Sequence, residues 1–347
     1  MQNPYTISFG REPGQMIPRP VQKTEIVENF SEEQPSIQTY MITGVRGSGK
    51  TVLLTDIANE LSKDDGWIVA ELNPEHDMLK ELAATLASKD ALVQIFKSAK
   101  INLSFFGMGL EISGVPPITD VEVALQRMLE ALKKKGRRVL IEVDEVTNTQ
   151  TVRELVSAFQ IFIRKDLPVF LLMTGLYENI YELQNAKTLT FLYRAPKIAL
   201  GPLNIGAIAS NYASVFHKDR EEAMKMAALT DGYSFAFQTL GYLTWEADGD
   251  YESVIDKYKQ YLEDYVYEKI WSGLSPTDRK VACGIAGSED GKISAIREKL
   301  DMTTNQFNPY RIRLIRKGIV DGTQRGILRF VLPLFKDFVQ EQAMLEI

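Results

Sequence analysis

Residues 44–51 read Gly-Val-Arg-Gly-Ser-Gly-Lys-Thr, and this stretch decides the fold expected for the chain. It matches G-x-x-x-x-G-K-[ST], a pattern in which a glycine-rich turn joins a strand to a helix and presents backbone N–H groups to phosphate. The setting agrees, because the apolar run Thr39 to Thr43 precedes the motif and the amphipathic stretch Val52 to Leu61 follows it. The expected nucleotide-binding residues of this loop are Gly44, Val45, Arg46, Gly47, Ser48, Gly49, Lys50 and Thr51.

The last two residues of the motif have separate expected tasks. The Lys50 ammonium would reach the β- and γ-phosphates, and the Thr51 hydroxyl would ligate Mg²⁺. The dipole of the following helix places positive potential at the same phosphates. A glycine-rich turn with a chance lysine is the alternative, and the strand-loop-helix setting argues against it. No Asn-Lys-x-Asp guanine signature occurs in the sequence, so ATP with Mg²⁺ is expected rather than GTP.

An acidic motif follows later in the chain, where residues 139–145 read Val-Leu-Ile-Glu-Val-Asp-Glu. An apolar strand that ends in two carboxylates suits this loop, because parallel strands end at the same edge of a sheet. We expect Asp144 to hold Mg²⁺ through water and Glu145 to orient and polarise the attacking water. A solvated loop start is the alternative for the two acids. Glu142, further back in the strand, is expected to be structural.

Two further residues are candidates for the reaction. Residues 169–174 form an apolar run that ends in Thr174, whose hydroxyl would bond near the γ-phosphate or the water if this strand lies beside residues 139–143. A plain strand-ending threonine is the alternative. Arg194 precedes the fifth strand, and its planar guanidinium suits the γ-phosphate of a neighbouring subunit, with an ordinary surface arginine as the equal alternative. The expected catalytic residues are Glu145, Lys50, Thr174 and Arg194.

The first half of the chain alternates short apolar runs with helical patterns, which is typical of a parallel sheet flanked by helices. The expected strands are Thr39 to Thr43, Trp67 to Leu72, Val139 to Val143, Val169 to Thr174 and Lys197 to Leu200. The expected helices are Val52 to Leu61, Met78 to Ser88, Val121 to Lys134 and Val152 to Arg164. Residues 101–114 alternate around two glycines and are expected to form an inserted β-hairpin.

The pattern changes twice in the second half of the chain. After Gly201-Pro202-Leu203 the strand pattern stops, and helices alone are expected through about Glu268. From Leu274 onward, short helices are followed by a glycine-containing turn and apolar strands. We therefore predict an α/β fold with three domains: a P-loop domain over residues 1–203, a helical domain over 204–270 and a domain of short helices and strands over 271–347, which the resemblance described below implies to be a lid and a winged helix.

The C-terminal part is locally basic, although the whole chain has a net charge of -6. Nine basic and three acidic residues between Lys292 and Arg329 give this part a charge of +6. Its last helix begins at Thr304 or at Asn308-Pro309, and residues 321–326 follow as the turn of a wing. Such a helix and wing suit duplex DNA, while protein contacts or domain packing are the alternative. The expected DNA contacts are Arg313, Arg316 and Arg325.

Composition excludes several classes of protein. With 347 residues, 45% of them hydrophobic and 25% charged, the chain is typical of globular proteins. The single cysteine, Cys283, excludes an intramolecular disulfide framework, and the two histidines have no zinc-finger spacing. No apolar run approaches the roughly 18 residues that span a bilayer, and no signal peptide is expected. These features favour a cytoplasmic protein without a membrane partner.

The order of these features resembles the initiator-type and archaeal-type AAA+ ATPases, close to the STAND NTPases. The resemblance rests on residues 44–51 and on Asp144 with Glu145; the remaining features agree only at the level of pattern. It implies an AAA+ domain, a helical lid and a winged helix, with ATP-dependent assembly of identical subunits. It also implies that Pro18 and Arg19 contact adenine, and that Thr174 and Arg194 act as sensor 1 and arginine finger.

The chain departs from this family in the lid. Residues 230–235 resemble the family's sensor 2 region but contain no arginine, which puts direct sensing of the γ-phosphate by the lid in doubt. The leading hypothesis is an ATP-hydrolysing switch whose winged helix engages DNA. A STAND-like signalling switch that holds ADP, with its winged helix used for protein or intramolecular contacts, is the alternative. A P-loop small-molecule kinase is disfavoured, because its chemistry needs no winged helix.

Overall fold

The computed structural model describes residues 2–8 and 13–345. The chain divides into two compact units. The sheet unit comprises Pro20–Thr43 and Lys50–Ala199. The helical unit comprises Met1–Arg19, Gly44–Gly49 and Leu200–Ile347. The helical unit therefore includes most of the phosphate-binding loop, although the strand before it and the helix after it belong to the sheet unit.

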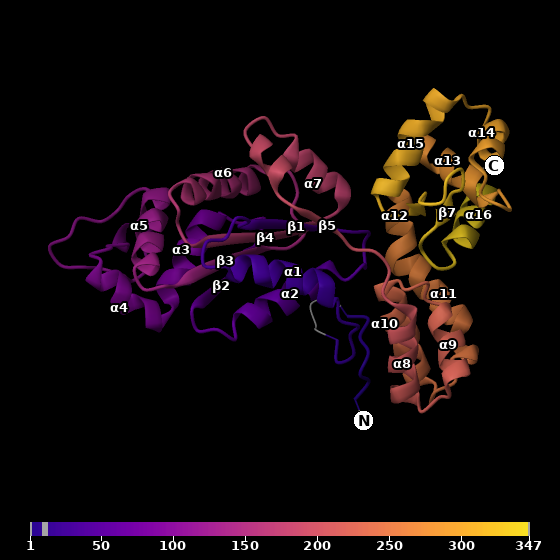
Figure 1. Cartoon of the computed structure of the whole chain (residues 1–347), viewed down its shortest axis with the longest axis horizontal. Coiled ribbons are helices and arrows are strands. Elements are labelled where there is room, and N and C mark those ends of the chain that lie inside the picture. The colour runs from indigo at the N-terminus through magenta and orange to yellow at the C-terminus, as the bar shows by residue number, and fades with distance from the viewer. Residues whose placement is uncertain (1, 9–12, 346–347) are drawn as a thin grey trace. The chain divides into compact units, whose positions relative to one another are not determined.

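The sheet unit contains a five-stranded parallel sheet, with strand order β2-β3-β4-β1-β5 (Figure 1). Its strands are β1 (Thr39–Thr43), β2 (Trp67–Glu71), β3 (Arg138–Val143), β4 (Val169–Gly175) and β5 (Lys197–Ala199). Every residue of β1 and β4 is buried, as expected for apolar runs with neighbours on both faces. The five strands expected from the sequence are confirmed, with ends that shift by at most one residue.

Helices cover both faces of this sheet. They are α1 (Pro20–Ser31), α2 (Lys50–Leu61), α3 (Met78–Ser88), α4 (Asp90–Ser98), α5 (Val121–Lys133), α6 (Gln150–Arg164) and α7 (Tyr177–Gln184). On one face, alternate residues of β3 such as Ile141 and Val143 share a core with α3, α5 and α6. On the other face, Phe30 of α1 packs against Tyr40 and Phe170. The sequence analysis did not expect α4.

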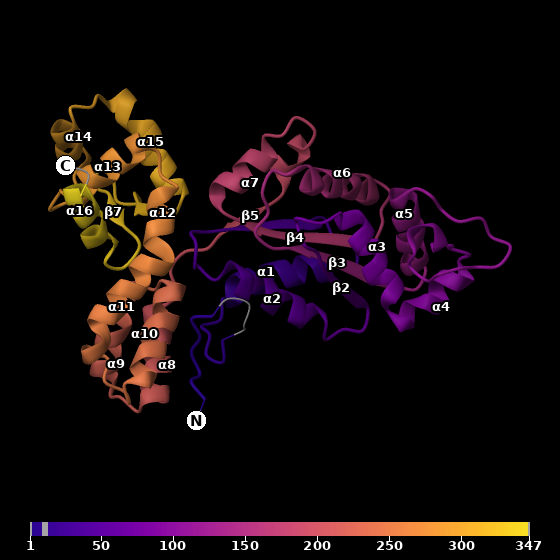
Figure 2. The ribbon, with the colours of Figure 1, turned by 180° about the vertical axis from the view of Figure 1, so that it is seen from behind.

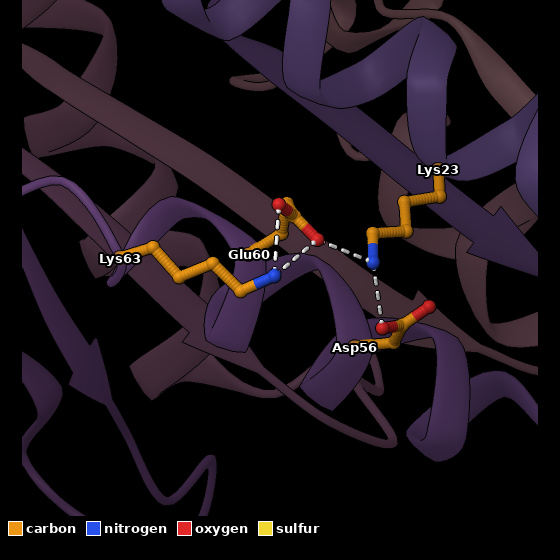
Figure 3. Close-up of polar contacts among 4 residues, drawn as sticks. All are labelled: Lys23, Asp56, Glu60 and Lys63. Atoms are coloured by element: carbon orange, nitrogen blue, oxygen red, sulfur yellow. Dashed lines mark hydrogen bonds and ion pairs between the residues drawn. The ribbon is translucent and has the colours of Figure 1, made fainter.

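An ion-pair cluster joins α1 to α2 (Figure 3). The Lys23 ammonium lies 2.9 Å from an oxygen of Asp56 and 2.7 Å from an oxygen of Glu60. Lys63 lies 3.1 Å from the other Glu60 oxygen, and these two lysines lower the pKa of the Glu60 carboxyl. The cluster fixes α1 beside the helix that begins within the phosphate-binding motif.

Residues 101–114 do not form the expected β-hairpin. This stretch contains one 3₁₀ turn, η1 (Ser104–Phe106), and no strand. Gly107 and Gly109 both have left-handed backbone angles, with φ of +71° and +68°, so the chain cannot continue as an extended strand there. One hydrogen bond, from the Leu103 N–H to the Leu110 carbonyl at 2.8 Å, closes the loop.

The long segment of the helical unit, Leu200–Ile347, begins with the helices α8 (Ile205–Phe216), α9 (Arg220–Ala228), α10 (Ser234–Glu246), α11 (Ile255–Leu262) and α12 (Glu268–Ser272). We refer to α8 to α12 as the lid helices. Figure 2 shows them from behind. The N-terminal segment packs on them, since the Tyr5 ring lies against Phe216 and Phe237. Gly241 of α10 accommodates this ring, because a Cβ atom there would lie 2.6 Å from it.

The C-terminal module continues the same hydrophobic core. It contains α13 (Pro276–Ala286), α14 (Ile293–Leu300), α15 (Thr304–Arg316), β6 (Val320–Asp321), β7 (Arg329–Phe330) and α16 (Phe335–Leu345). The strands β6 and β7 pair in antiparallel fashion. Of the two starts considered for α15, the structure has the first: Thr303 caps the helix in a reciprocal pair with Gln306, and Pro309 lies inside it. Within residues 2–8 and 13–345, no helix is long and apolar enough to cross a membrane.

Candidate nucleotide-binding site

Three neighbouring strands of the sheet unit end at one edge. In the registers of the sheet, Val143 of β3 lies beside Met173 of β4, and Gly175 of β4 lies beside Thr43 of β1. Thr174 therefore lies on the strand between the two motifs, next to the strand that precedes Asp144. The strand that carries Thr174 thus lies beside residues 139–143, as the role expected for its hydroxyl requires.

Asp144 receives a hydrogen bond on each carboxylate oxygen. The Thr51 hydroxyl donates to Oδ2 at 2.6 Å, and the Thr174 hydroxyl donates to Oδ1. Thr174 is fully buried, whereas Asp144 is partly exposed. The carboxylate is thus fixed between the start of α2 and the end of β4, within the sheet unit.

The Thr51 hydroxyl and the Asp144 carboxylate fit Mg²⁺. Both are hard oxygen donors, which Mg²⁺ prefers, and they lie side by side at the end of β3. Lys50, the first residue of α2, is 8% exposed. The sequence thus places Lys50, the cation expected to reach phosphate, directly before the residue whose hydroxyl bonds to the Asp144 carboxylate.

Glu145 has an unusual backbone conformation. Its φ angle is +52°, in the left-handed region that costs a non-glycine residue about 1–2 kcal/mol. Its N–H donates to the Thr174 hydroxyl at 3.2 Å and to Asp144 Oδ1 at 3.0 Å. The next N–H, of Val146, donates to the Thr174 carbonyl at 2.8 Å. These bonds hold the turn and leave the Glu145 side chain exposed.

Glu142 is a buried carboxyl that sequence reasoning treated only as structural. It is 6% exposed, and its Oε1 atom has no hydrogen-bond partner among the described residues. Burial and the negative charges of Glu71 and Asp144 raise its pKa to about 8. The apolar sequence around Glu142 was the available sign of this burial.

The loop Gly44–Gly49 is bound through its carbonyl groups within the helical unit. The Tyr233 hydroxyl donates to the Arg46 carbonyl at 2.5 Å, and the Phe235 N–H donates to the Gly47 carbonyl at 3.1 Å. The Ser234 hydroxyl donates to the Ser48 carbonyl at 2.9 Å. From the sequence, residues 230–235 were noted only because they lack the arginine of the family's sensor 2 region, and their contacts with the loop were not predicted.

Arg19 joins the same contacts. Its guanidinium donates to the Ser48 carbonyl at 3.1 Å and to the Ser234 hydroxyl at 3.5 Å, and burial lowers its pKa. Pro18 beside it is exposed. Arg194 is exposed at the end of a 3₁₀ turn, η2 (Thr190–Arg194), just before β5.

The expected DNA-contact residues differ in their surroundings. Arg313 is ion-paired with Asp278, with 2.8 Å between its terminal nitrogen and Oδ1, and Asp278 is 2% exposed. Its guanidinium also lies 5.0 Å from the centre of the Tyr310 ring. Arg316 is exposed at the end of α15, and Arg325 is exposed in the turn between β6 and β7. All three arginines are thus exposed, and Arg313 in addition pairs with a buried carboxylate.

Comparison with known proteins adds two family matches. The family described as "ATPase domain predominantly from Archaea" matches residues 23–169. A domain of unknown function (DUF8462) matches residues 264–339. No curated protein matches the chain.

Solved structures with a similar fold cover nearly the whole chain. The Walker-type ATPase PABY2304 of Pyrococcus abyssi aligns over 94% of this chain and 96% of its own, with a TM-score of 0.66 and 15% identity. The ORC2 protein of Aeropyrum pernix, in its ADPNP–ADP complexes, aligns over 97% and 98%, with a TM-score of 0.60 and 14% identity. The parallel sheet, the matched ATPase domain and these neighbours together show that the chain has the fold of AAA+-like P-loop ATPases.

Proposed function

We propose that the protein is a switch that binds ATP with Mg²⁺ and hydrolyses it. The observation that supports this function best is the bonding of Asp144 by Thr51 on one side and Thr174 on the other. A carboxylate and a hydroxyl are thereby oriented next to the lysine of the phosphate-binding motif.

Each residue of the site has a task in this proposal. Lys50 neutralises charge on the β- and γ-phosphates, and Thr51 with Asp144 holds the metal ion. When bound, Mg²⁺ supplies positive charge that stabilises the phosphates in the transition state. Glu145, exposed at the end of β3, accepts a hydrogen bond from the attacking water and orients it. Thr174 keeps the Asp144 carboxylate in place.

The proposal includes a second subunit. Arg194 is exposed on a turn before β5, where its guanidinium is accessible to another copy of the chain. There it supplies positive charge to that copy's γ-phosphate, as a planar and permanently charged group. Assembly of identical subunits would then depend on ATP.

DNA engagement belongs to the C-terminal module in this proposal. Three helices followed by the antiparallel pair β6 and β7 have the order of a winged helix, with α15 as its recognition helix. Arg316 and Arg325 supply the phosphate contacts, while Arg313 orients α15 through Asp278.

The proposed location of the protein is a reducing cytoplasm, because a chain with a single cysteine cannot form an intramolecular disulfide.

A second candidate function has its own support. The C-terminal module and the lid helices share one core, and Lys259 of α11 pairs with Glu341 of α16 at 2.7 Å. A Cβ atom at Gly318 would lie 3.7 Å from Val45 of the phosphate-binding loop. These intramolecular contacts favour a signalling switch that holds ADP, in which this module regulates the lid instead of binding DNA.

One set of measurements tests the proposal. Lys50→Ala should abolish tight ATP binding and leave the fold intact, because it removes a cation aimed at phosphate. Unchanged ATP affinity in calorimetry would refute the nucleotide site.

The rate of ATP hydrolysis, measured with and without duplex DNA, separates the two proposed functions. Stimulation by DNA supports the first, whereas copurified ADP with negligible turnover supports the second.

A further inference from the structure

The lid helices contact the phosphate-binding loop through a row of hydrogen-bond donors. Tyr233, Ser234 and Phe235, at the start of α10, bond the consecutive carbonyls of residues 46–48, and Arg19 adds a second bond to the last of them. We name these four residues the carbonyl clamp. All of its members and the loop belong to the helical unit.

The clamp determines which way the loop's amides point. Because a peptide group is planar and trans, a carbonyl held on one side directs the N–H of the next residue to the opposite side. Bonds on the carbonyls of Arg46 and Ser48 therefore direct the amides of Gly47 and Gly49 away from the clamp. These are the backbone groups that a phosphate-binding loop presents to its ligand.

The clamp lies so close to the loop that residue 47 must be glycine. Gly47 has φ of +73°, and a Cβ atom there would lie 2.9 Å from the Phe235 Cβ and would also overlap the Tyr233 hydroxyl. Tyr233 is 5% exposed, and burial raises the pKa of its hydroxyl, which therefore remains a donor at physiological pH.

We propose that the carbonyl clamp couples the lid helices to bound nucleotide through the backbone of the phosphate-binding loop. This coupling rests on the nucleotide site proposed above and takes the place of a sensor arginine, which residues 230–235 lack. Phosphate favours the amide orientation that the clamp imposes. By reciprocity, bound nucleotide strengthens the clamp and orders the start of α10.

The test compares a double variant, Tyr233→Phe with Ser234→Ala, with a matched control. The double variant keeps the ring and removes two hydroxyl donors. The control is Tyr258→Phe, which removes a lid hydroxyl whose bond, 2.9 Å long, goes to the Leu229 carbonyl and not to the loop. Ser234→Ala alone serves as the milder variant if the double variant does not fold.

Two readouts are measured with MgADP as the probe. The double variant should bind ADP about tenfold more weakly than wild type, whereas the control should stay within about twofold. ADP should slow amide hydrogen exchange in residues 233–240 of wild type and control, but not of the double variant. Equal ADP affinity, or equal protection by ADP, in the double variant and the control would overturn the coupling and leave the nucleotide site standing. If wild type binds no ADP, the nucleotide site itself is refuted and the coupling falls with it.

Discussion

Thr174 donates its hydroxyl hydrogen to Oδ1 of Asp144, so a residue of β4 sets the orientation of the carboxylate that follows β3. The same hydroxyl accepts the Glu145 N–H at 3.2 Å. One buried side chain thus orders both acids of the motif. The bond of Thr174 to phosphate or to the attacking water, expected from the sequence, stays a prediction.

Thr174→Val tests this arrangement, because valine has a similar shape and no hydroxyl. The change leaves the Asp144 carboxylate with one donor fewer, and we expect the rate of ATP hydrolysis to fall about tenfold or more. Unfolding by denaturant should show a loss of about 1–3 kcal/mol. Thr174→Ser keeps the hydroxyl and should retain most activity. Equal rates in the two variants would show that the hydroxyl has no part in the reaction.

Glu145→Gln should separate binding from hydrolysis. The amide keeps the size of the side chain but cannot take a proton from water, so turnover should fall on the order of 10²-fold. ATP affinity measured by calorimetry should remain close to that of wild type. Phosphate release at the wild-type rate would assign the base to another residue.

Glu142 should make stability depend on pH. Its pKa is raised to about 8 in the folded protein, so folding favours the protonated form. Its contribution is complete below the unfolded pKa of about 4.5 and is lost as pH rises towards 8, by up to about 5 kcal/mol. Glu142→Gln should remove this loss. Denaturant unfolding of both proteins at pH 5 and pH 8 measures the difference, and parallel pH profiles would contradict it.

The strands and most helices of the sheet unit could be predicted because local patterns determine them. Continuous apolar runs between amphipathic stretches are typical of strands whose two faces are both covered by neighbours. The loop around Gly107 was misread because alternation of apolar residues does not reveal left-handed glycines. The bond between Thr174 and Asp144, and the contacts of Tyr233 with the loop, join residues far apart in the chain. No spacing in the sequence specifies such pairs.

Arg194→Ala tests whether the site is shared between subunits. The variant should bind ATP as wild type does and lose hydrolysis, because it lacks the positive charge that we propose stabilises the γ-phosphate bound to a neighbouring subunit. Mixing it with Glu145→Gln should partly restore turnover, since one interface then pairs an intact arginine with an intact carboxylate. Mixed oligomers without any restored activity would place the role of Arg194 within its own subunit.

The last prediction concerns duplex DNA and separates Arg313 from its neighbours. Replacing Arg316 and Arg325 together with glutamate should weaken DNA binding strongly, because two cations that face phosphate become anions. ATP affinity should not change. The matched control, Arg127→Glu with Arg164→Glu, makes the same charge change on exposed residues of α5 and α6 and should bind DNA as wild type does.

Arg313→Ala should behave differently, because it leaves the Asp278 carboxylate buried without its cation. We expect a lower melting temperature, corresponding to a loss of about 1–3 kcal/mol, with the DNA defect following from the weakened module. Wild-type affinity for DNA should fall steeply between about 50 and 200 mM salt, as counterion release requires. If wild type binds no duplex at low salt, with ATP or with ADP, the C-terminal module does not engage DNA. Its contacts with the lid helices then assign it to the signalling switch.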